Sequence, residues 1–205
     1  EELARLGISI GNGEAVMENA WLIKSSDEIL AMRRAIVACE AAMGEMEKAL
    51  TPGISENELW AELHRGNIAR GGEWIETRLL AIGERTFPWF KECSAHVGKE
   101  GDMLSFDTDL IGPYGYCADL SRSWTVGLVK PKPMQKEIYA FAHEQIMHNW
   151  SIIKPGMSFS EFNDKSLRIP EEYHENRYGV ALHGVGLCDE YPSVPTHVDM
   201  DRGKG

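Results

Sequence analysis

The sequence predicts an α+β fold built from two similar helix–helix–strand halves. Three observations support this. Long segments with apolar residues at helical spacing alternate with short segments that favour strands. A Pro-Gly turn between a long helix and a shorter one occurs twice. Between these two turns lies a run rich in β-branched and aromatic residues, interrupted by glycines and one proline, which is typical of a hairpin.

Four helices are expected, and two of them begin with a clear capping signal. Ser25 and Glu28 have the spacing of a capping box, and the helix that follows runs to about Leu50. Ser55 and Glu58 form a second capping box, which opens a helix to about Arg70. The apolar residues expected on one face of the first helix are Ile29, Met32, Ile36, Met43, Met46 and Leu50. The remaining helices are expected at about 134–152 and from about 160, with strands at 73–83 and up to His183, a loop at 84–90 and no clear period from Pro192.

An internal repeat supports the division into halves. The run Leu50-Thr51-Pro52-Gly53-Ile54-Ser55 has the same pattern as Ile153-Lys154-Pro155-Gly156-Met157-Ser158, which lies 103 residues further on. Pro-Gly before a capped helix is a common stop and start signal, so coincidence is one explanation. The other explanation, which we favour, is a duplicated unit with two halves about a pseudo-twofold axis.

Three aspartates stand inside the predicted hairpin. Asp107 and Asp109 alternate along a segment that favours a strand, so they are expected on one face. The Gly112-Pro113 turn would fold the next strand, from Tyr116 to about Val126, back so that Asp119 lies beside them. Like charges this close suppress one another's ionisation unless a cation lies between them, which predicts a divalent metal site. The alternative is an Asp-x-Asp pair that is merely solvated on an exposed strand.

A histidine downstream favours the metal interpretation. His183 stands between Leu182 and the glycines of Gly184-Val185-Gly186, whose backbone can approach a site closely. Neutral imidazole suits zinc, iron or manganese better than magnesium. A lone histidine is also a common structural residue, and that alternative stays open at this point.

Composition excludes several classes of function. The 205 residues include 43 % hydrophobic and 26 % charged residues, which is ordinary for a globular protein. The net charge of −11 argues against nucleic acid and anionic membranes as partners. The four cysteines, at positions 39, 93, 117 and 188, include no C-x-x-C pair, so a reduced, cytoplasmic protein is expected, with Cys117 and Cys188 as buried packing residues.

Taken together, three motifs resemble those of the pita-bread metalloenzymes, the group that includes methionine aminopeptidase, prolidase and creatinase. They are Gly115-Tyr116 with Asp119 and Arg122, the Lys154-Pro155-Gly156 turn, and His183-Gly184 with Gly186. The resemblance implies a pita-bread fold, with two pseudo-symmetric halves around a curved antiparallel sheet. It also implies a dinuclear metal centre with two Asp, one His and two Glu ligands, of which Asp107, Asp119 and His183 would fill the first three places.

The same resemblance sets expectations for the extent of the domain. The two glutamate ligands of the family lie on strands that follow the histidine by several tens of residues, whereas this sequence ends at Gly205. Residues 25–205 are therefore expected to be a catalytic pita-bread domain truncated at the C-terminus, with its last strands missing. Residues 1–24 are expected to be an N-terminal segment or linker.

Departures from the peptidase pattern resemble one branch of the family, the dimethylsulfoniopropionate lyases. The first acidic motif is Asp107-Thr108-Asp109 instead of Asp-x-Gly, and Asp189 stands about where peptidases carry a second histidine. The resemblance implies β-elimination of dimethylsulfoniopropionate to dimethyl sulfide and acrylate. Asp107, Asp109, Asp119 and His183 would be metal ligands, Asp189 the base, and Tyr178 a wall of the substrate pocket.

Cofactors and partners follow from the same resemblance. It implies two divalent transition-metal ions, iron first and zinc or manganese as alternatives, a small zwitterionic substrate and a homodimer. An aromatic ring could hold the sulfonium by cation–π attraction; Trp89, Trp124 and Tyr191 are candidates on composition, with core packing as the alternative for each. Two other functions stay open, a metal-dependent aminopeptidase or Xaa-Pro dipeptidase-like hydrolase and an inactive pita-bread binding module.

Overall fold

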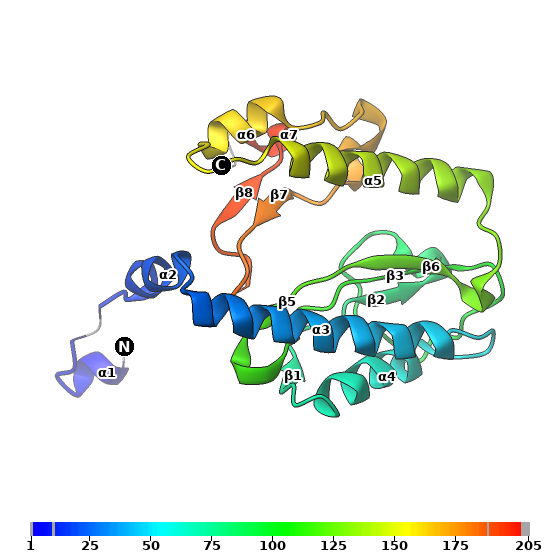
Figure 1. Cartoon of the computed structure of the whole chain (residues 1–205), viewed down its shortest axis with the longest axis horizontal. Helices are drawn as coiled ribbons and strands as arrows, with labels where there is room; N and C mark the ends of the chain where they lie inside the picture. Colours follow the sequence, from blue (N-terminus) through cyan, green and yellow to red (C-terminus); the bar gives the residue numbers. More distant parts are fainter. Residues whose placement is uncertain (1, 10, 188, 202–205) are drawn as a thin grey trace.

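The computed structural model describes residues 2–9, 11–187 and 189–201, which form helices and short antiparallel strands. Helices α3 and α4 pack together on one side of the strands, and α5 and α6 lie on the opposite side of the molecule (Figure 1). The α-helices are α1 (Glu2–Arg5), α2 (Glu14–Leu22), α3 (Ser26–Ala49), α4 (Glu56–Ile68), α5 (Pro133–Ile152), α6 (Phe159–Lys165) and α7 (His197–Asp201). The strands are β1 (Trp74–Ile75), β2 (Leu80–Ile82), β3 (Met103–Phe106), β4 (Leu110–Ile111), β5 (Cys117–Ala118), β6 (Arg122–Thr125), β7 (Val180–His183) and β8 (Ser193–Pro195).

Both predicted capping boxes are confirmed. The Ser25 hydroxyl accepts a hydrogen bond from the Glu28 amide at 3.3 Å, and the Glu28 carboxylate accepts one from the Ser25 amide at 2.7 Å. Ser55 and Glu58 repeat this exchange at 3.3 and 2.8 Å. Since each pair satisfies amides that a helix start leaves without partners, the sequence fixes where α3 and α4 begin.

The buried face of α3 is made of small residues, and the predicted apolar face is partly wrong. Ile29 and Ile36 are 41 % and 36 % exposed, while Ala35 and Ala42 are fully buried. A Cβ atom added to Gly66 of α4 would lie 2.7 Å from the Cβ of Ala42, which is closer than real side chains approach. The backbones of α3 and α4 therefore lie so close that small residues such as alanine fit on this face and larger ones do not. The core between α3, α4 and the strands includes Met46, Leu59, Leu63, Leu80, Leu104 and Phe106.

Each long strand expected from the sequence is interrupted near its middle. The segment 73–83 contains β1 and β2, the segment 103–111 contains β3 and β4, and the segment 116–126 contains β5 and β6. Two three-stranded sheets result, with the orders β1-β4-β5 and β2-β3-β6. The breaks at 76–79 and 107–109 lie beside one another, because the Glu76 amide donates to the Asp109 carbonyl at 3.1 Å and the Asp107 amide donates to the Leu79 carbonyl at 2.9 Å.

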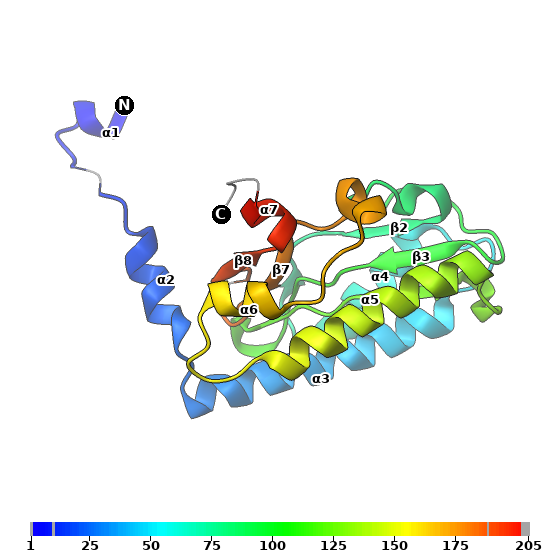
Figure 2. The same cartoon turned by 90° about the horizontal axis from the view of Figure 1, so that it is seen from above.

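The internal repeat recurs in the local geometry. Gly53 and Gly156 both have a positive φ, at 96° and 83°, which a residue with a side chain rarely adopts. The Ser158 hydroxyl accepts a hydrogen bond from the Glu161 amide at 3.1 Å, as Ser55 does from Glu58. Helix α5 therefore leads into α6 through the same kind of turn by which α3 leads into α4. In Figure 2, seen from above, α3 and α5 lie roughly parallel along the length of the molecule.

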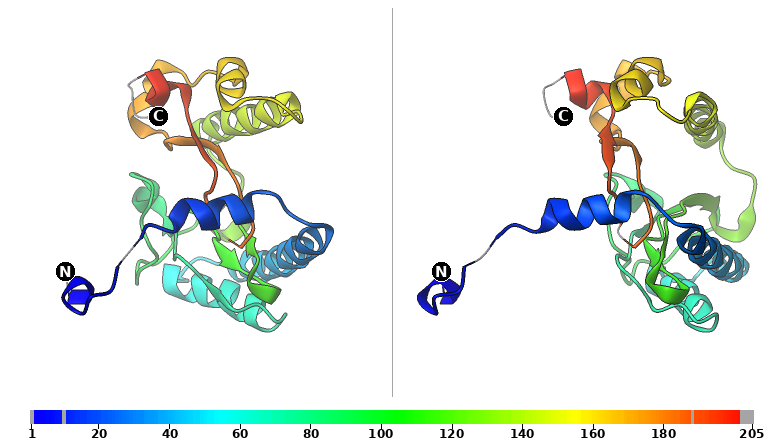
Figure 3. Two further views of the ribbon diagram at one scale, coloured as in Figure 1. Left: turned by 90° about the vertical axis from the view of Figure 1, so that its left-hand side faces the viewer. Right: turned by 60° about the vertical axis from the view of Figure 1, so that its left-hand side comes forward.

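The two halves meet through the loop after β7. Strands β7 and β8 pair antiparallel, so the stretch from Pro192 is more regular than the sequence predicted. The Cys117 amide of β5 donates to the Gly186 carbonyl at 2.7 Å, which ties this loop to the edge of the first sheet. Figure 3 shows α1 away from the rest of the chain, with α2 between α1 and α3. Among the described helices, none has both the length and the apolar character to cross a bilayer.

Cys39, Cys93 and Cys117 are buried, as expected for packing residues. Cys188 lies outside the described residues.

Candidate metal centre

The breaks in the strands bring the three predicted aspartates together. Asp107 and Asp109 lie between β3 and β4, and Asp119 follows β5. One ligand atom from each of the three carboxylates lies within 4.8 Å of the others. The expected reason for this convergence is wrong, because the aspartates do not share a face of a continuous strand. Asp109 has a positive φ of 34°, so the chain turns at this residue instead of continuing the pleat.

Thr108 lies between Asp107 and Asp109, in the break between β3 and β4. Its side chain is fully buried. The hydroxyl donates to the Ala118 carbonyl at 2.9 Å and accepts from the Leu120 amide at 2.8 Å. These bonds tie Thr108 to the residues on either side of Asp119. They therefore hold Asp107 and Asp109 close to Asp119. Sequence analysis gave Thr108 no role, although a threonine between two aspartates in an apolar run was the available signal.

Hydroxyl groups orient two of the carboxylates. The Thr77 hydroxyl donates to Asp109 Oδ2 at 2.5 Å, and the Ser121 hydroxyl donates to Asp107 Oδ1 at 3.1 Å. Burial, and then the neighbouring Asp119 and Asp109 carboxylates, raise the pKa of Asp107 to about 8. Burial also raises the pKa of Asp109. A cation between these groups would offset the repulsion that disfavours their charged forms.

His183, at the end of β7, contacts the same cluster from the second half of the chain. Its Nε2 lies 3.1 Å from Asp119 Oδ2, and its Nδ1 lies 3.9 Å from Asp189 Oδ1. The bond to Asp119 raises the pKa of His183 to about 9, and burial raises the pKa of Asp189 to about 7. The Nδ1 atom also lies 3.0 Å from the Gly184 carbonyl. Donation from Nδ1 to that carbonyl leaves Nε2 as the nitrogen that faces the carboxylates.

The donor set fits divalent transition metals. Asp119, His183 and Asp189 form a second group whose ligand atoms lie within 4.8 Å of one another. The two groups share Asp119; the first offers carboxylate oxygens alone, and the second adds the imidazole of His183. Mixed oxygen and nitrogen donors are typical of iron, manganese and zinc sites.

A pocket of about 530 Å³ opens beside the cluster. Asp109 and Asp189 form its wall on the side of the cluster, and Glu76 and Glu190 add two further carboxylates. Trp21 of α2 and Trp74 of β1 also line it. Sequence analysis missed both tryptophans, because nothing local to α2 or β1 shows that they lie near Asp109. The segment 1–24 thus contributes a residue to this pocket.

Tyr178 lies at the boundary with a second pocket. It lines a larger space of about 740 Å³ between α5 and β7. Its hydroxyl donates to Glu190 Oε1 at 3.2 Å, and its ring packs against Phe90 with the centroids 5.2 Å apart. Burial, and then the charge of Glu190, raise the pKa of Tyr178. Tyr178 is thereby connected, through Glu190, to the pocket beside the aspartates.

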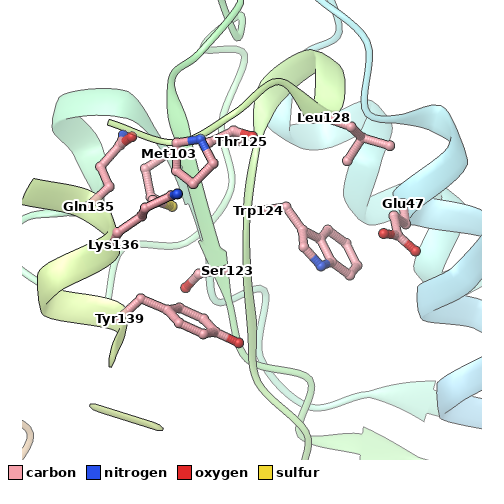
Figure 4. Close-up of a pocket in the computed structure, with 10 residues that line it drawn as sticks. Glu47, Met103, Ser123, Trp124, Thr125, Leu128, Gln135, Lys136 and Tyr139 are labelled. Atoms are coloured by element: carbon pink, nitrogen blue, oxygen red, sulfur yellow. The ribbon is translucent and has the colours of Figure 1, made fainter. Parts of the chain in front are cut away.

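Two of the aromatic candidates named from composition, Trp89 and Trp124, are not among the residues that line the pocket beside the aspartates. Trp124 packs on Phe106 with the ring centroids 5.0 Å apart, and Trp89 lies next to Phe90 at 6.1 Å. Trp124 lines a third pocket, of about 420 Å³, where Figure 4 shows it on the same side as Glu47 while Tyr139 lies across the strand. Among the described residues lining that pocket, Glu47 is the single carboxylate, so this pocket lacks the cluster of acidic groups found around Asp119.

Comparison with known proteins agrees with this geometry. The chain is 49 % identical to the dimethylsulfoniopropionate lyase DddP of Roseovarius nubinhibens over 193 residues, which is 92 % of this chain and 43 % of that protein. It is 46 % identical to the DddP of Roseobacter denitrificans, over 93 % of this chain and 44 % of that protein. The chain therefore spans less than half the length of these relatives.

Solved structures show the same fold. The prolidase from Pyrococcus furiosus superposes with a TM-score of 0.77 at 26 % identity, over 90 % of this chain and 55 % of that one. The prolidase from Pyrococcus horikoshii gives a TM-score of 0.78 at 25 % identity, over 90 % and 53 %. The expected α+β pita-bread fold is thus confirmed. Residues 30–204 match the model of metallopeptidase family M24, and the chain belongs to that family.

Proposed function

We propose that this chain is part of a metal-dependent lyase that cleaves dimethylsulfoniopropionate into dimethyl sulfide and acrylate. The observation that supports this best is the identity of 46–49 % to two dimethylsulfoniopropionate lyases over more than nine-tenths of the chain. The position of Asp189 is in accord with it, because its carboxylate lies beside His183 and lines the pocket that Asp109 also lines.

The reaction requires a base at the α-carbon of the substrate. In the proposed step, an oxygen of Asp189 takes the α-proton, and the C–H electron pair becomes the second bond between the α- and β-carbons. The C–S bond breaks, and its electron pair leaves with the neutral sulfide. A carboxylate with a pKa near 7 is a much stronger base than an ordinary aspartate, yet it is still ionised in part at neutral pH.

The remaining residues would hold the metal ions or orient the side chains that bind them. Asp107, Asp109, Asp119 and His183 would hold two divalent ions, which when bound would polarise the substrate carboxylate and stabilise negative charge that develops at the α-carbon. Thr77 and Ser121 fix the carboxylate rotamers through the hydrogen bonds described above. Because the substrate expels its own leaving group, no attacking water has to be positioned, and a second histidine is not required.

The test is headspace detection of dimethyl sulfide from the purified protein, expressed at the full length of its gene and supplied with iron, zinc or manganese in turn. We expect dimethyl sulfide and acrylate in equal amounts with at least one metal. If no metal gives either product, the proposed function is wrong.

Two other functions are outcomes of the same experiment. Release of amino acids from Xaa-Pro dipeptides without dimethyl sulfide would identify a peptidase, the function named in the solved structures that share the fold. Absence of bound metal by elemental analysis, together with neither activity, would identify a binding module.

We further propose iron as the native metal, with zinc or manganese as alternatives, since mixed aspartate and histidine donors accept all three. We propose a homodimer in the cytoplasm, with residues 25–205 in the catalytic domain and residues 1–24 as the segment that leads into it. The resemblance to the pita-bread lyases supports these assignments. Mass measurement by light scattering tests the dimer.

A further inference from the structure

The pocket beside the aspartates is lined by two kinds of side chain. Asp109 and Asp189 belong to the groups that would hold metal, and Glu76 and Glu190 add two further carboxylates. The indoles of Trp21 and Trp74 line the same pocket. Among the described residues that line this pocket, four are acidic and none is basic. Such a lining attracts a cation and repels an anion.

Trp74 presents a large exposed aromatic surface on β1. It is 53 % exposed, while its neighbour on β1, Ile75, is 4 % exposed and lies in the core. Packing within the described residues therefore does not account for the exposed part of this indole. Trp21 is half-buried at the last turn of α2, and it reaches the same pocket from a separate element.

Aromatic faces and carboxylates together suit a cation that carries methyl groups instead of hydrogen-bond donors. Such a cation has no hydrogen-bond donor, so it cannot form a hydrogen-bonded salt bridge. It is attracted to the negative face of an aromatic ring, and most strongly to the indole of tryptophan. Sulfonium and quaternary ammonium groups belong to this class.

We propose that Trp21 and Trp74, supported by Glu76 and Glu190, form the subsite that binds the methylated cationic end of the substrate. With the cationic end held by the indoles, the substrate carboxylate would be directed toward the metal-ligating groups. The proposal rests on the proposed function for the choice of a substrate with both groups, and it assigns specificity to residues that no sequence motif indicated.

The experiment compares two ligands of the same shape that differ in charge. The cationic probe is 3-(trimethylammonio)propanoate, which has a positively charged trimethylammonium end. The control probe is its carbon isostere, 4,4-dimethylpentanoate, which has an uncharged tert-butyl end and the same carboxylate. Affinity for the metal-loaded, full-length protein is measured by calorimetry, and the readout is the ratio of the two dissociation constants. We expect the cationic probe to bind more tightly, which a site that recognises shape and carboxylate alone would not produce.

Variants assign the preference to the indoles. Trp74→Leu is expected to reduce the ratio by about 2- to 30-fold, the fold-change that corresponds to ~0.5–2 kcal/mol for a cation–π contact. Trp74→Phe should give an intermediate ratio, and Trp21→Leu should act in the same direction. Trp150→Leu is the matched control, because Trp150 lies on α5, is 75 % exposed and is outside this pocket, and it should leave the ratio unchanged.

The outcomes separate this inference from the proposed function. A ratio near one in the unsubstituted protein, or a ratio that folded Trp74→Leu and Trp21→Leu both leave unchanged, overturns the cation subsite even if dimethyl sulfide is produced. A high ratio that falls in these variants supports the subsite even if no dimethyl sulfide appears, in which case the proposed lyase reaction is what fails. Circular dichroism of each variant shows whether it is folded.

Discussion

Replacement of Thr108 by valine tests how the fold builds the metal centre. Valine has nearly the shape of threonine, so the change removes the hydroxyl while the packing is kept. The Leu120 amide and the Ala118 carbonyl both lose their bond to this hydroxyl, at 2.8 and 2.9 Å. These two backbone groups connect the break at 107–109 to the break at 119–121, which carries Asp119.

The magnitude follows from the burial of these groups. The partly buried Leu120 amide, left without a partner, costs about 1–3 kcal/mol, and the lost bond to the buried Ala118 carbonyl adds about 0.5–1.5 kcal/mol. The free energy of unfolding should therefore fall by roughly 2–4 kcal/mol. For a chain of this size this is a decrease in Tm of roughly 4–16 °C. Loss of a positioning contact behind the ligands should weaken metal binding by about 10–100-fold.

The assay is urea denaturation of the metal-free protein, followed by metal titration. Thr108→Ser is the control, because it keeps the hydroxyl and loses one methyl group, at a cost of about 0.8 kcal/mol. The role given to Thr108 is refuted if two results are found together. The free energies of unfolding of Thr108→Val and Thr108→Ser would differ by less than about 1 kcal/mol, and Thr108→Val would bind metal as tightly as the unsubstituted protein.

Three further predictions concern other charged groups. Glu56 is fully buried and accepts from Arg85 at 3.0 Å, so Glu56→Ala should lower the free energy of unfolding by roughly 3–5 kcal/mol, and a loss below about 1 kcal/mol in denaturation would contradict this. The folded-state pKa of Asp107, at about 8, lies above its ordinary value, so the metal-free protein binds extra protons on folding and should lose stability as pH rises from about 4 to 8. Bound metal replaces those protons, so the increase in Tm on adding metal should grow over this range, and a constant increase would argue against a cation among these carboxylates. Asp189→Asn should reduce lyase turnover by about 10²- to 10⁴-fold with metal content retained, and unchanged turnover would refute its role as the base.

The local features of this protein were predictable from sequence. Both capping boxes, at Ser25 and Ser55, and the repeated turns at Gly53 and Gly156 are where the sequence places them. Each depends on residues within one turn of helix or one tight turn, so the chain needs no distant partner to define them. The identity of the acidic cluster was also predictable, because three aspartates and a histidine in apolar surroundings need compensation wherever they lie.

The tertiary structure alone decided how those groups meet. A continuous strand would have placed Asp107 and Asp109 on one face, but pairing with the interrupted neighbouring segments breaks the strand, and the buried hydroxyl of Thr108 takes the place of backbone partners. Strand length depends on hydrogen-bond partners that are far away in the sequence, and a periodic pattern contains no information about them. For the same reason Trp21 could not be assigned to a pocket with Asp109, since only the folded chain brings the end of α2 to the edge of the first sheet.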